Sequence, residues 1–484
     1  MLKKWLTVLG LAAVSVWGAS AQDAKTVVAS ASKAMGVDTL KSVQFSATGY
    51  DFALGQAPNG NSPWPRFIEK SYTRSIDFER PASRVERVRL QGENPPRGGG
   101  QQPIVGEQPV TQTIIVAADT PWPQQLEIWM MPHGFLRAAT ARNATVESKT
   151  ISGRKYQIVS FVGDNQAKVN GYINDRNLID RVETWIDNPL YGDMLFESIY
   201  SDYRAAGSAQ FPTHIVQKQA GYPIFDLTIT DVKVNAAVDI QPPQGRGGAG
   251  IVAPAAAATS PSSERLGEGI YLITGGYASI AIDFKDHITI IEAGQSEARG
   301  LAVIAEAKRL IPNKPVTVVV NTHSHIDHSS GLRAAVAEGA TILTHQTNKA
   351  YLEKTLALPH ALNPDKAQQN GKKPVVEAAG AKQVLTDGTR VVELHHLPNF
   401  GHHDGMLLAY FPKEKVLLEA DAYNPQAANA TPPSPPSPYT VSLVDHIQRL
   451  KLDVQRIVPV HYPADNRVVT LAELTKWVGR APTH

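Results

Sequence analysis

Three histidines and one aspartate lie within one short segment of the chain, Thr322–His328, which reads Thr-His-Ser-His-Ile-Asp-His. The segment directly follows the β-branched run Val316–Val320, which predicts a buried strand, so the polar residues begin where the strand ends. Imidazole nitrogens and carboxylate oxygens are the ligands that Zn²⁺ prefers when thiolates are absent. The segment therefore predicts a metal site at the end of a strand.

Three later segments place the same residue types at a glycine-bounded turn or at the end of an apolar run. The residues that they add are His402 or its neighbour His403, Asp421 and His461. Together with His323, His325, Asp327 and His328 they form a set of seven. Seven ligands are too many for one tetrahedral Zn²⁺ but suit two ions that share one carboxylate. The pattern therefore favours a two-metal site, and it leaves open whether His402 or His403 takes part.

These residues resemble the metallo-β-lactamase superfamily of metallohydrolases. Thr322–His328 contains the H-x-H-x-D-H signature, and Gly401–Gly405 looks like the family's G-H-x-x-G turn. The runs that end on Asp421 and His461 stand where the family has its bridging acid and its last histidine. The resemblance covers roughly Glu264 to the C-terminus. It implies an α+β fold, the αββα four-layer sandwich, in which outer helices cover two mixed sheets.

The resemblance also implies the roles of the seven residues. His323, His325 and His402 would hold one ion, Asp327, His328 and His461 would hold the second, and Asp421 would bridge them. Two Zn²⁺ per chain are expected, with iron and manganese as alternatives, and Asp327 is expected to be catalytic as well as a ligand. Should the turn shift by one residue, His403 would replace His402.

The expected reaction is attack of metal-bound hydroxide on a small ester, lactone, thioester or amide. A β-lactam is within this range, although a chain with 0 Cys cannot belong to the β-lactamases that use a cysteine ligand. Asp421 stands in place of that thiolate, as in glyoxalase II-like enzymes. His345, His395 and His396 are assigned no ligand role. The Pro-rich loop 429–440 is expected to line the substrate cleft.

The first residues predict export. Met1–Lys4 is basic, Trp5–Trp17 is an apolar run, and Gly18–Ala21 supplies small residues in an A-x-A pattern. This order is typical of a secretory signal peptide (residues 1–21), cleaved after Ala21, and predicts a periplasmic or secreted protein without a later membrane-spanning segment.

Residues 22–242 contain short alternating runs, such as Val43–Leu54 and Phe225–Val234, which predict a mainly antiparallel β domain that is curved or a half-barrel. A Pro-, Gly-, Ala- and Ser-rich linker is predicted at 243–263, before the metal domain at 264–484. Because the β domain has no catalytic cluster, we expect residues 264–484 to act independently of it.

Two functions remain after this reading. The first is an exported zinc-dependent hydrolase acting on a small-molecule substrate. The alternative is a periplasmic substrate- or lipid-binding protein whose metal domain is vestigial. The complete ligand set favours the hydrolase, because a decayed site loses ligands first. A net charge of +2 gives no electrostatic reason to expect a nucleic-acid partner.

Overall fold

The computed structural model describes residues 19–100, 102–163, 166, 168–242 and 261–480. Residues 1–18 of the predicted signal peptide and 243–260 of the predicted linker lie outside this part. The linker prediction extends too far, because β12 (Ser262–Gly267) already begins within it. Among the described residues, no helix combines the length and apolar character that a membrane span requires.

The N-terminal half is built on one antiparallel sheet with strand order β4-β3-β2-β1-β11-β10-β9-β8-β7-β6-β5. The mainly antiparallel β domain predicted from the sequence is thus confirmed. Its strands are β1 (Ser42–Phe52), β2 (Arg66–Asp77), β3 (Ala82–Gln91), β4 (Gln108–Ile115), β5 (Thr145–Ile151), β6 (Arg154–Val162), β7 (Lys168–Ile173), β8 (Ile179–Asn188), β9 (Gly192–Ala206), β10 (Ala209–Gln219) and β11 (Tyr222–Val234).

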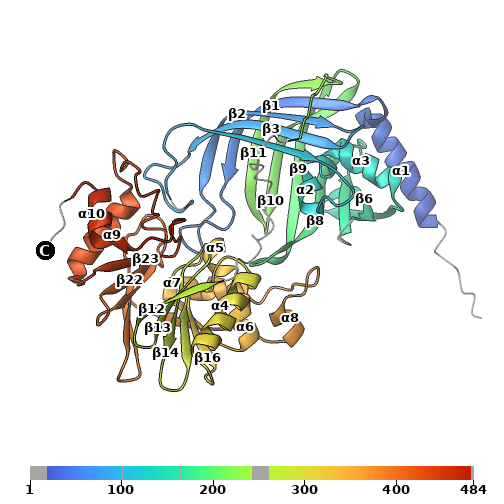
Figure 1. Cartoon of the computed structure of the whole chain (residues 1–484). Helices are drawn as coiled ribbons and strands as arrows, with labels where there is room; N and C mark the ends of the chain where they lie inside the picture. The colour runs from blue at the N-terminus through green and yellow to red at the C-terminus, as the bar shows by residue number, and fades with distance from the viewer. Residues whose placement is uncertain (1–18, 101, 164–165, 167, 243–260, 481–484) are drawn as a thin grey trace, which may run out of the picture.

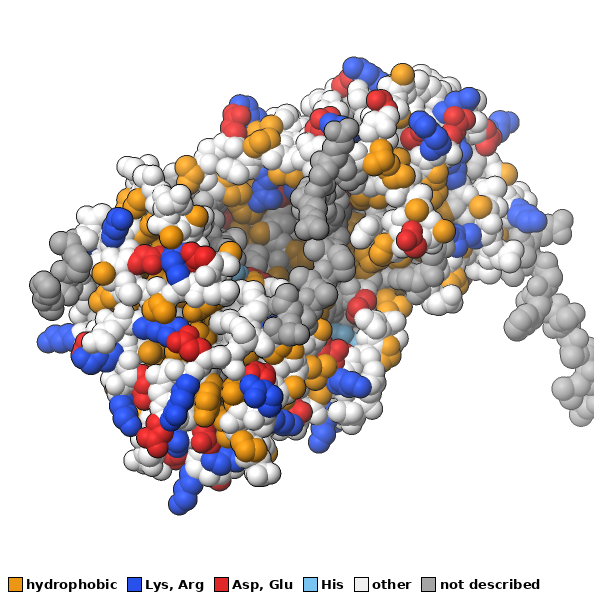
Figure 2. All heavy atoms as spheres, viewed as in Figure 1, with side chains coloured by type: hydrophobic (Ala, Val, Ile, Leu, Met, Phe, Trp, Pro, Cys, Tyr) orange, Lys and Arg blue, Asp and Glu red, His pale blue; other side chains and the backbone are white. Residues whose placement is uncertain are grey.

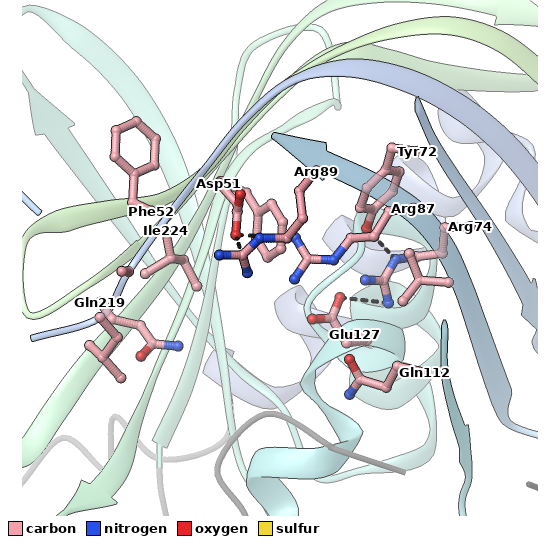
Figure 3. Close-up of a pocket in the computed structure, with 14 residues that line it drawn as sticks. Asp51, Phe52, Tyr72, Arg74, Arg87, Arg89, Gln112, Glu127, Gln219 and Ile224 are labelled. Carbon is pink, nitrogen blue, oxygen red and sulfur yellow. Dashed lines mark hydrogen bonds and ion pairs between the residues drawn. The ribbon is translucent and has the colours of Figure 1, made fainter. Parts of the chain in front are cut away.

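The sheet curves into an arch, and three helices pack inside it (Figure 1). These are α1 (Ala19–Met35), α2 (Trp122–Trp129) and α3 (Pro132–Ala141), and a short 3₁₀ turn, η1 (Val37–Thr39), follows α1. Phe135 of α3 is completely buried, and a Cβ at Gly171 of β7 would come within 2.3 Å of its ring. A glycine is therefore required where the helix approaches the strand most closely. The arch also encloses a cavity between the strands and α2 (Figure 3).

The C-terminal half contains two further sheets. The seven-stranded sheet has the order β12-β13-β14-β15-β16-β17-β18 and is antiparallel up to β15 and parallel beyond it. The six-stranded sheet has the order β19-β20-β21-β22-β23-β24, with one parallel pair, β22 and β23. Besides β12, the strands are β13 (Ile270–Thr274), β14 (Ser279–Asp283), β15 (Ile288–Ile291), β16 (Val316–Val320), β17 (Thr341–His345), β18 (Val375–Ala379), β19 (Lys382–Thr386), β20 (Val391–His396), β21 (Leu407–Phe411), β22 (Val416–Glu419), β23 (Arg456–Pro459) and β24 (Val469–Thr470).

Helices cover the outer faces of both sheets and complete the four layers (Figure 1). They are α4 (Glu297–Leu310), α5 (Ile326–Ser329), α6 (Leu332–Glu338), α7 (Gln346–Thr355), α8 (Lys366–Asn370), α9 (Pro438–Leu450) and α10 (Leu471–Trp477). Apolar side chains of both sheets, such as Ile280 and Leu394, form one buried cluster between them. The predicted αββα sandwich is confirmed.

The arch and the sandwich pack against each other through a common hydrophobic core. A second buried cluster runs from the N-terminal strands to the helices of the seven-stranded sheet, and Trp64 and Leu352 both belong to it. Tyr191 and Tyr351 meet through their hydroxyl groups at 2.6 Å. On the face shown in Figure 2, lysine and arginine side chains alternate with aspartate and glutamate, without a large patch of one sign.

Candidate metal centre

The predicted site residues lie at the ends of strands from both sheets. β16 of the seven-stranded sheet leads into His323, and His402 lies in the turn between β20 and β21. Asp421 follows β22, and His461 follows β23. Parallel pairing of β22 with β23 brings their carboxyl ends to one edge, which explains why residues so far apart in sequence meet.

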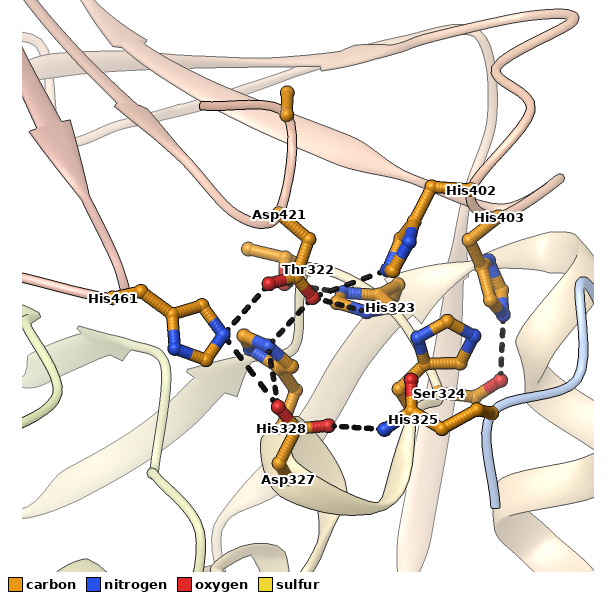
Figure 4. A network of polar contacts seen from close by, with 12 residues as sticks. Thr322, His323, Ser324, His325, Asp327, His328, His402, His403, Asp421 and His461 are labelled. Atoms are coloured by element: carbon orange, nitrogen blue, oxygen red, sulfur yellow. Dashed lines mark hydrogen bonds and ion pairs between the residues drawn. The ribbon is translucent and has the colours of Figure 1, made fainter. Parts of the chain in front are cut away.

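The structure brings all seven predicted residues together (Figure 4). They form two groups in which the ligand atoms lie within 4.8 Å of one another, and both groups contain Asp421. The groups are His323, His325, His402 and Asp421, and Asp327, His328, Asp421 and His461. The partition and the shared carboxylate are those that the family resemblance implied.

Hydrogen bonds from outside the groups fix which nitrogen of two histidines faces inward. The Nε2 of His325 is 2.9 Å from the carbonyl oxygen of Ala57, so it must carry the proton, and the buried Nδ1 has no hydrogen-bond partner. The Nδ1 of His328 likewise donates to Glu292 at 2.9 Å, and its Nε2 lies 3.0 Å from Asp421. Each ring thus directs its other nitrogen into the group, which is how a histidine ligand is normally held.

The neighbouring histidines of the turn have different surroundings. The Nε2 of His402 lies 3.1 Å from Asp421, and its Nδ1 has no hydrogen-bond partner. Both ring nitrogens of His403 are already engaged, Nδ1 by the backbone N–H of Gly405 and Nε2 by the hydroxyl of Ser324, each at 2.9 Å. The geometry therefore selects His402 from the two alternatives that the sequence left open.

The N-terminal half reaches into this site through the loop between β1 and β2. Gln56 donates from Nε2 to Oδ1 of Asp327 at 2.9 Å, and Ala57 accepts the hydrogen bond from His325. The backbone N–H of Ile326 donates to the carbonyl of Gly55. Two of the seven residues are therefore oriented from outside residues 264–484, which argues against the expectation that this range acts independently. No residue type in the loop signals this contact.

Two more residues of the sandwich support the site and were missed from the sequence. The hydroxyl of Tyr277 donates to Oδ2 of Asp327 at 3.0 Å. Glu292 accepts from His328 and from the backbone N–H of Thr322. Glu292 and Asp421 both have positive φ, at 66° and 56°, a strained backbone that is frequent at functional sites. The available sequence signal for Glu292 was a carboxylate that directly follows the apolar run Ile288–Ile291.

Charge within the site favours a cation. Burial and the neighbouring His328 lower the pKa of His323 to about 4, so its imidazole is neutral at neutral pH. Burial acts in the same direction on His461, yet Asp421 and Asp327 outweigh it and raise the pKa of His461 to about 9. Carboxylates that stabilise a protonated histidine would equally stabilise a metal ion. The donor set, its protonation and its buried, inward-facing nitrogens all fit a metal pair.

A cleft of about 540 Å³ opens at Asp327. Its walls come from both halves of the molecule and include Leu54, Asn188 and Ser330. Within the described residues its lining has four acidic side chains (Asp187, Glu297, Asp327 and Asp365) and neither lysine nor arginine.

The Pro-rich loop does not line this cleft. Pro433, Pro435 and Pro436 line a separate cavity together with Gln102 and Val105, so that expectation is wrong for the prolines. Its end forms the start of α9, where Tyr439 packs against His402 with ring centroids 5.2 Å apart.

The histidines without a predicted ligand role lie outside both groups. His345 stacks on His396 at a centroid distance of 3.8 Å, and His395 pairs with Glu393. His345 is buried.

Comparison with known proteins identifies the C-terminal half. Residues 274–461 match the family model of the metallo-beta-lactamase superfamily, and this range contains all seven site residues. The C-terminal half belongs to this superfamily. No curated protein matches the chain. The family match begins after the N-terminal sheet, so the arch lies outside the matched range.

Among solved structures, a metallo-beta-lactamase from Pontibacter korlensis is 17% identical over 45% of this chain and 97% of its own, with a TM-score of 0.35. One from Hirschia baltica is 14% identical over 46% and 97%, also with a TM-score of 0.35. FIM-1 from Pseudomonas aeruginosa, in its mono-zinc form, is 14% identical over 46% and 95%, with a TM-score of 0.34.

Proposed function

We propose that the protein is an exported hydrolase that uses two metal ions, zinc in the first instance, to cleave a small ester, lactone, thioester or amide. The observation that carries the proposal is the pair of ligand groups that share Asp421. When bound, such a pair of cations supplies Lewis acidity and lowers the pKa of water, so that hydroxide is available to attack a carbonyl at neutral pH.

The chain's own residues hold the site in one arrangement. Gln56 and Tyr277 bind the two oxygens of Asp327, so this carboxylate cannot rotate freely. Glu292 does the same for the ring of His328. Fixing ligands through their outer hydrogen bonds keeps the inward atoms in place before substrate arrives, which lowers the reorganisation that reaction requires.

The cleft favours a carbonyl substrate over a phosphodiester. Its volume of about 540 Å³ is that of a small-molecule site. A phosphodiester would bring negative charge beside Asp187 and Glu297 without a lining lysine or arginine to pair with it. A neutral ester, lactone or thioester meets no such repulsion.

Hydrolysis by the zinc-loaded full-length chain tests the proposal. The substrates are p-nitrophenyl acetate, a γ-lactone, an acyl thioester, nitrocefin and bis(p-nitrophenyl) phosphate. We expect turnover of at least one carbonyl compound, lost with EDTA and restored by zinc, and slower turnover of the phosphodiester. The proposal would be contradicted if the fully metal-loaded wild type hydrolysed no carbonyl compound faster than the Asp421→Ala variant does.

Export is a separate part of the proposal, and it is supported by the basic, apolar and small-residue segments of residues 1–21. N-terminal sequencing of the protein from an expressing bacterium should find Gln22 first. A chain that still begins at Met1 and stays in the cytoplasmic fraction would refute it.

A further inference from the structure

A cavity of about 310 Å³ lies inside the arch of the N-terminal sheet and contains none of the seven metal-site residues. We call it the sheet cavity. Strands β1 to β4, β10, β11 and helix α2 all contribute side chains to it (Figure 3). Its volume is that of a small-molecule site. Leu54 lines both this cavity and the cleft at Asp327.

Charged side chains are buried around the sheet cavity. Arg74 and Glu127 pair at 2.8 Å, with only 5% and 4% of their side chains exposed. Arg87 and Arg89 lie 3.3 Å and 3.1 Å from Asp51. Burying ion pairs costs desolvation energy that apolar residues of similar size would not, so such pairs are weak devices for stability alone. Their position around a cavity points to recognition.

Charges of both signs lie around the sheet cavity. Arg74, Arg87 and Arg89 line it together with Asp51 and Glu127. Glu69, which is not in the lining, pairs with Arg87 and brings the carboxylates to three, and burial raises its pKa to about 7. An anionic ligand would meet buried carboxylates, and a cationic ligand would meet buried guanidinium groups. Like charges in a partly desolvated site repel strongly. The arrangement therefore suits a ligand without net charge.

Polar atoms of the lining lack partners. Oδ1 of Asp51, Oε1 of Glu127 and Oε1 of Gln219 are buried without a hydrogen bond, on residues that are 4%, 4% and 2% exposed. Nε2 of Gln112 and Nε of Arg89 are also unpartnered. Buried polar atoms normally have partners, and leaving them without one costs free energy. Three oxygens that only accept and two N–H groups that donate call for a ligand rich in hydroxyl groups, which can both donate and accept.

The sheet cavity also has apolar walls. Phe52, Leu54, Ile224 and Phe225 line it. In Figure 3, Phe52 and Ile224 lie on one side of Asp51, whereas Glu127 and Gln112 lie on the other. A ligand with hydroxyl groups along its edge and an apolar face satisfies both sides at once. A sugar ring with an aromatic or alkyl substituent has this character.

We propose that the sheet cavity is a binding site for an uncharged, hydroxyl-rich ligand with an apolar face, of the glycoside class. This site is distinct from the metal centre and does not depend on the proposed hydrolase function. Binding is therefore measured directly, on the full-length chain with and without metal.

Calorimetric titration with three matched probes tests the proposal: phenyl β-D-glucoside, which is neutral, phenyl β-D-glucuronide, which is anionic, and phenyl β-D-glucosaminide, which is cationic. We expect the glucoside to bind with a dissociation constant of about 1 mM or tighter and each charged probe about tenfold more weakly. Failure of the glucoside to bind at 10 mM, or tighter binding of either charged probe, would overturn the proposal.

Variants on β10 supply the control. Gln219→Leu removes an unpartnered acceptor of the sheet cavity, and we expect about tenfold weaker glucoside binding. Gln217→Leu is the matched control. Gln217 is also a glutamine, lies on the same face of β10 and is similarly buried, but it does not line the cavity. Circular dichroism checks that both fold. Equal affinity in wild type and Gln219→Leu, or an equal loss in Gln217→Leu, would assign binding elsewhere.

Discussion

At the scale of the residue, His402 and His403 are adjacent and chemically identical, yet only one faces the site. The Ser324 hydroxyl and the Gly405 N–H occupy both nitrogens of His403, whereas His402 is directed at Asp421. His402→Ala should therefore lose metal and activity, and His403→Ala should retain both ions with a modest change in turnover. Elemental analysis of the two variants decides between them, and the reverse ranking would show that the turn is read one residue out of register.

Gln56 is a positioning residue for Asp327, although it lies in the other half of the molecule. Removing the partner of a metal ligand commonly lowers metal affinity roughly 10–100-fold. We expect Gln56→Leu to weaken zinc binding by about this factor in competition with a chromophoric chelator. Gln44→Leu on β1, which loses a hydrogen bond to Ser75 of β2, serves as the control. An unchanged zinc affinity in Gln56→Leu would remove this residue from the site.

The sequence predicted the ligands but not their supports, for a physical reason. A metal site requires particular residue types, and His-x-His-x-Asp-His is rare enough by chance to be recognised. An outer hydrogen bond can come from any amide or carbonyl, as Gln56 and Ala57 show. Only the fold decides which of them lies close enough.

At the scale of the element, the β1–β2 loop packs so closely against α5 that position 55 has no room for a side chain. A Cβ at Gly55 would lie 2.7 Å from Cβ of Ile326. Gly55→Ala should displace the loop and reduce zinc affinity and turnover together. Gly106→Ala is matched to it, because Gly106 has a similar positive φ (+69° against +67°) but open space around it. If both variants lose the same activity, backbone strain rather than the loop contact is responsible.

Helix α3 gives a prediction of pH dependence away from the metal centre. Burial lowers the pKa of His133 to about 4, and its Nε2–H donates to the carbonyl of Gln210. Between pH 6.5 and 4 the unfolded chain takes up a proton there and the folded chain does not, so stability falls as pH falls. The full shift corresponds to about 3 kcal/mol. His133→Gln should flatten this loss in urea unfolding of the metal-free protein, and an unchanged pH slope would contradict the assignment.

The elements of the sandwich were predicted better than those of the arch. Two apolar runs stand out in the sequence: Ile288–Ile291 is buried throughout, and Val316–Val320 is buried at its first residue and its last two. β9 (Gly192–Ala206) carries several charged residues and was not predicted, although buried and partly exposed positions alternate along much of it. The short helices α2 and α3 were also missed, because each is defined by packing inside the arch more than by its own pattern.

At the scale of the whole molecule, the arch and the sandwich meet at the cleft that opens on Asp327. Loop 53–65 supplies hydrogen bonds to the metal site, and Gly98 exchanges hydrogen bonds with Gly401 and Tyr439. Composition alone suggested two independent domains, because the linker is rich in small residues and proline. Contacts between loops far apart in sequence carry no such signal, which is why the coupling of the two halves had to come from the structure.

Metal content tests the central claim most directly. Seven residues in two groups that share Asp421 should hold about two metal ions per chain. The measurement is elemental analysis of full-length protein purified without chelator and supplied with zinc, beside Asp421→Ala. We predict about two zinc ions in the wild type and a loss of at least one in the variant, with circular dichroism unchanged. A folded wild-type protein that binds no metal, or a variant that keeps both ions, would contradict the account.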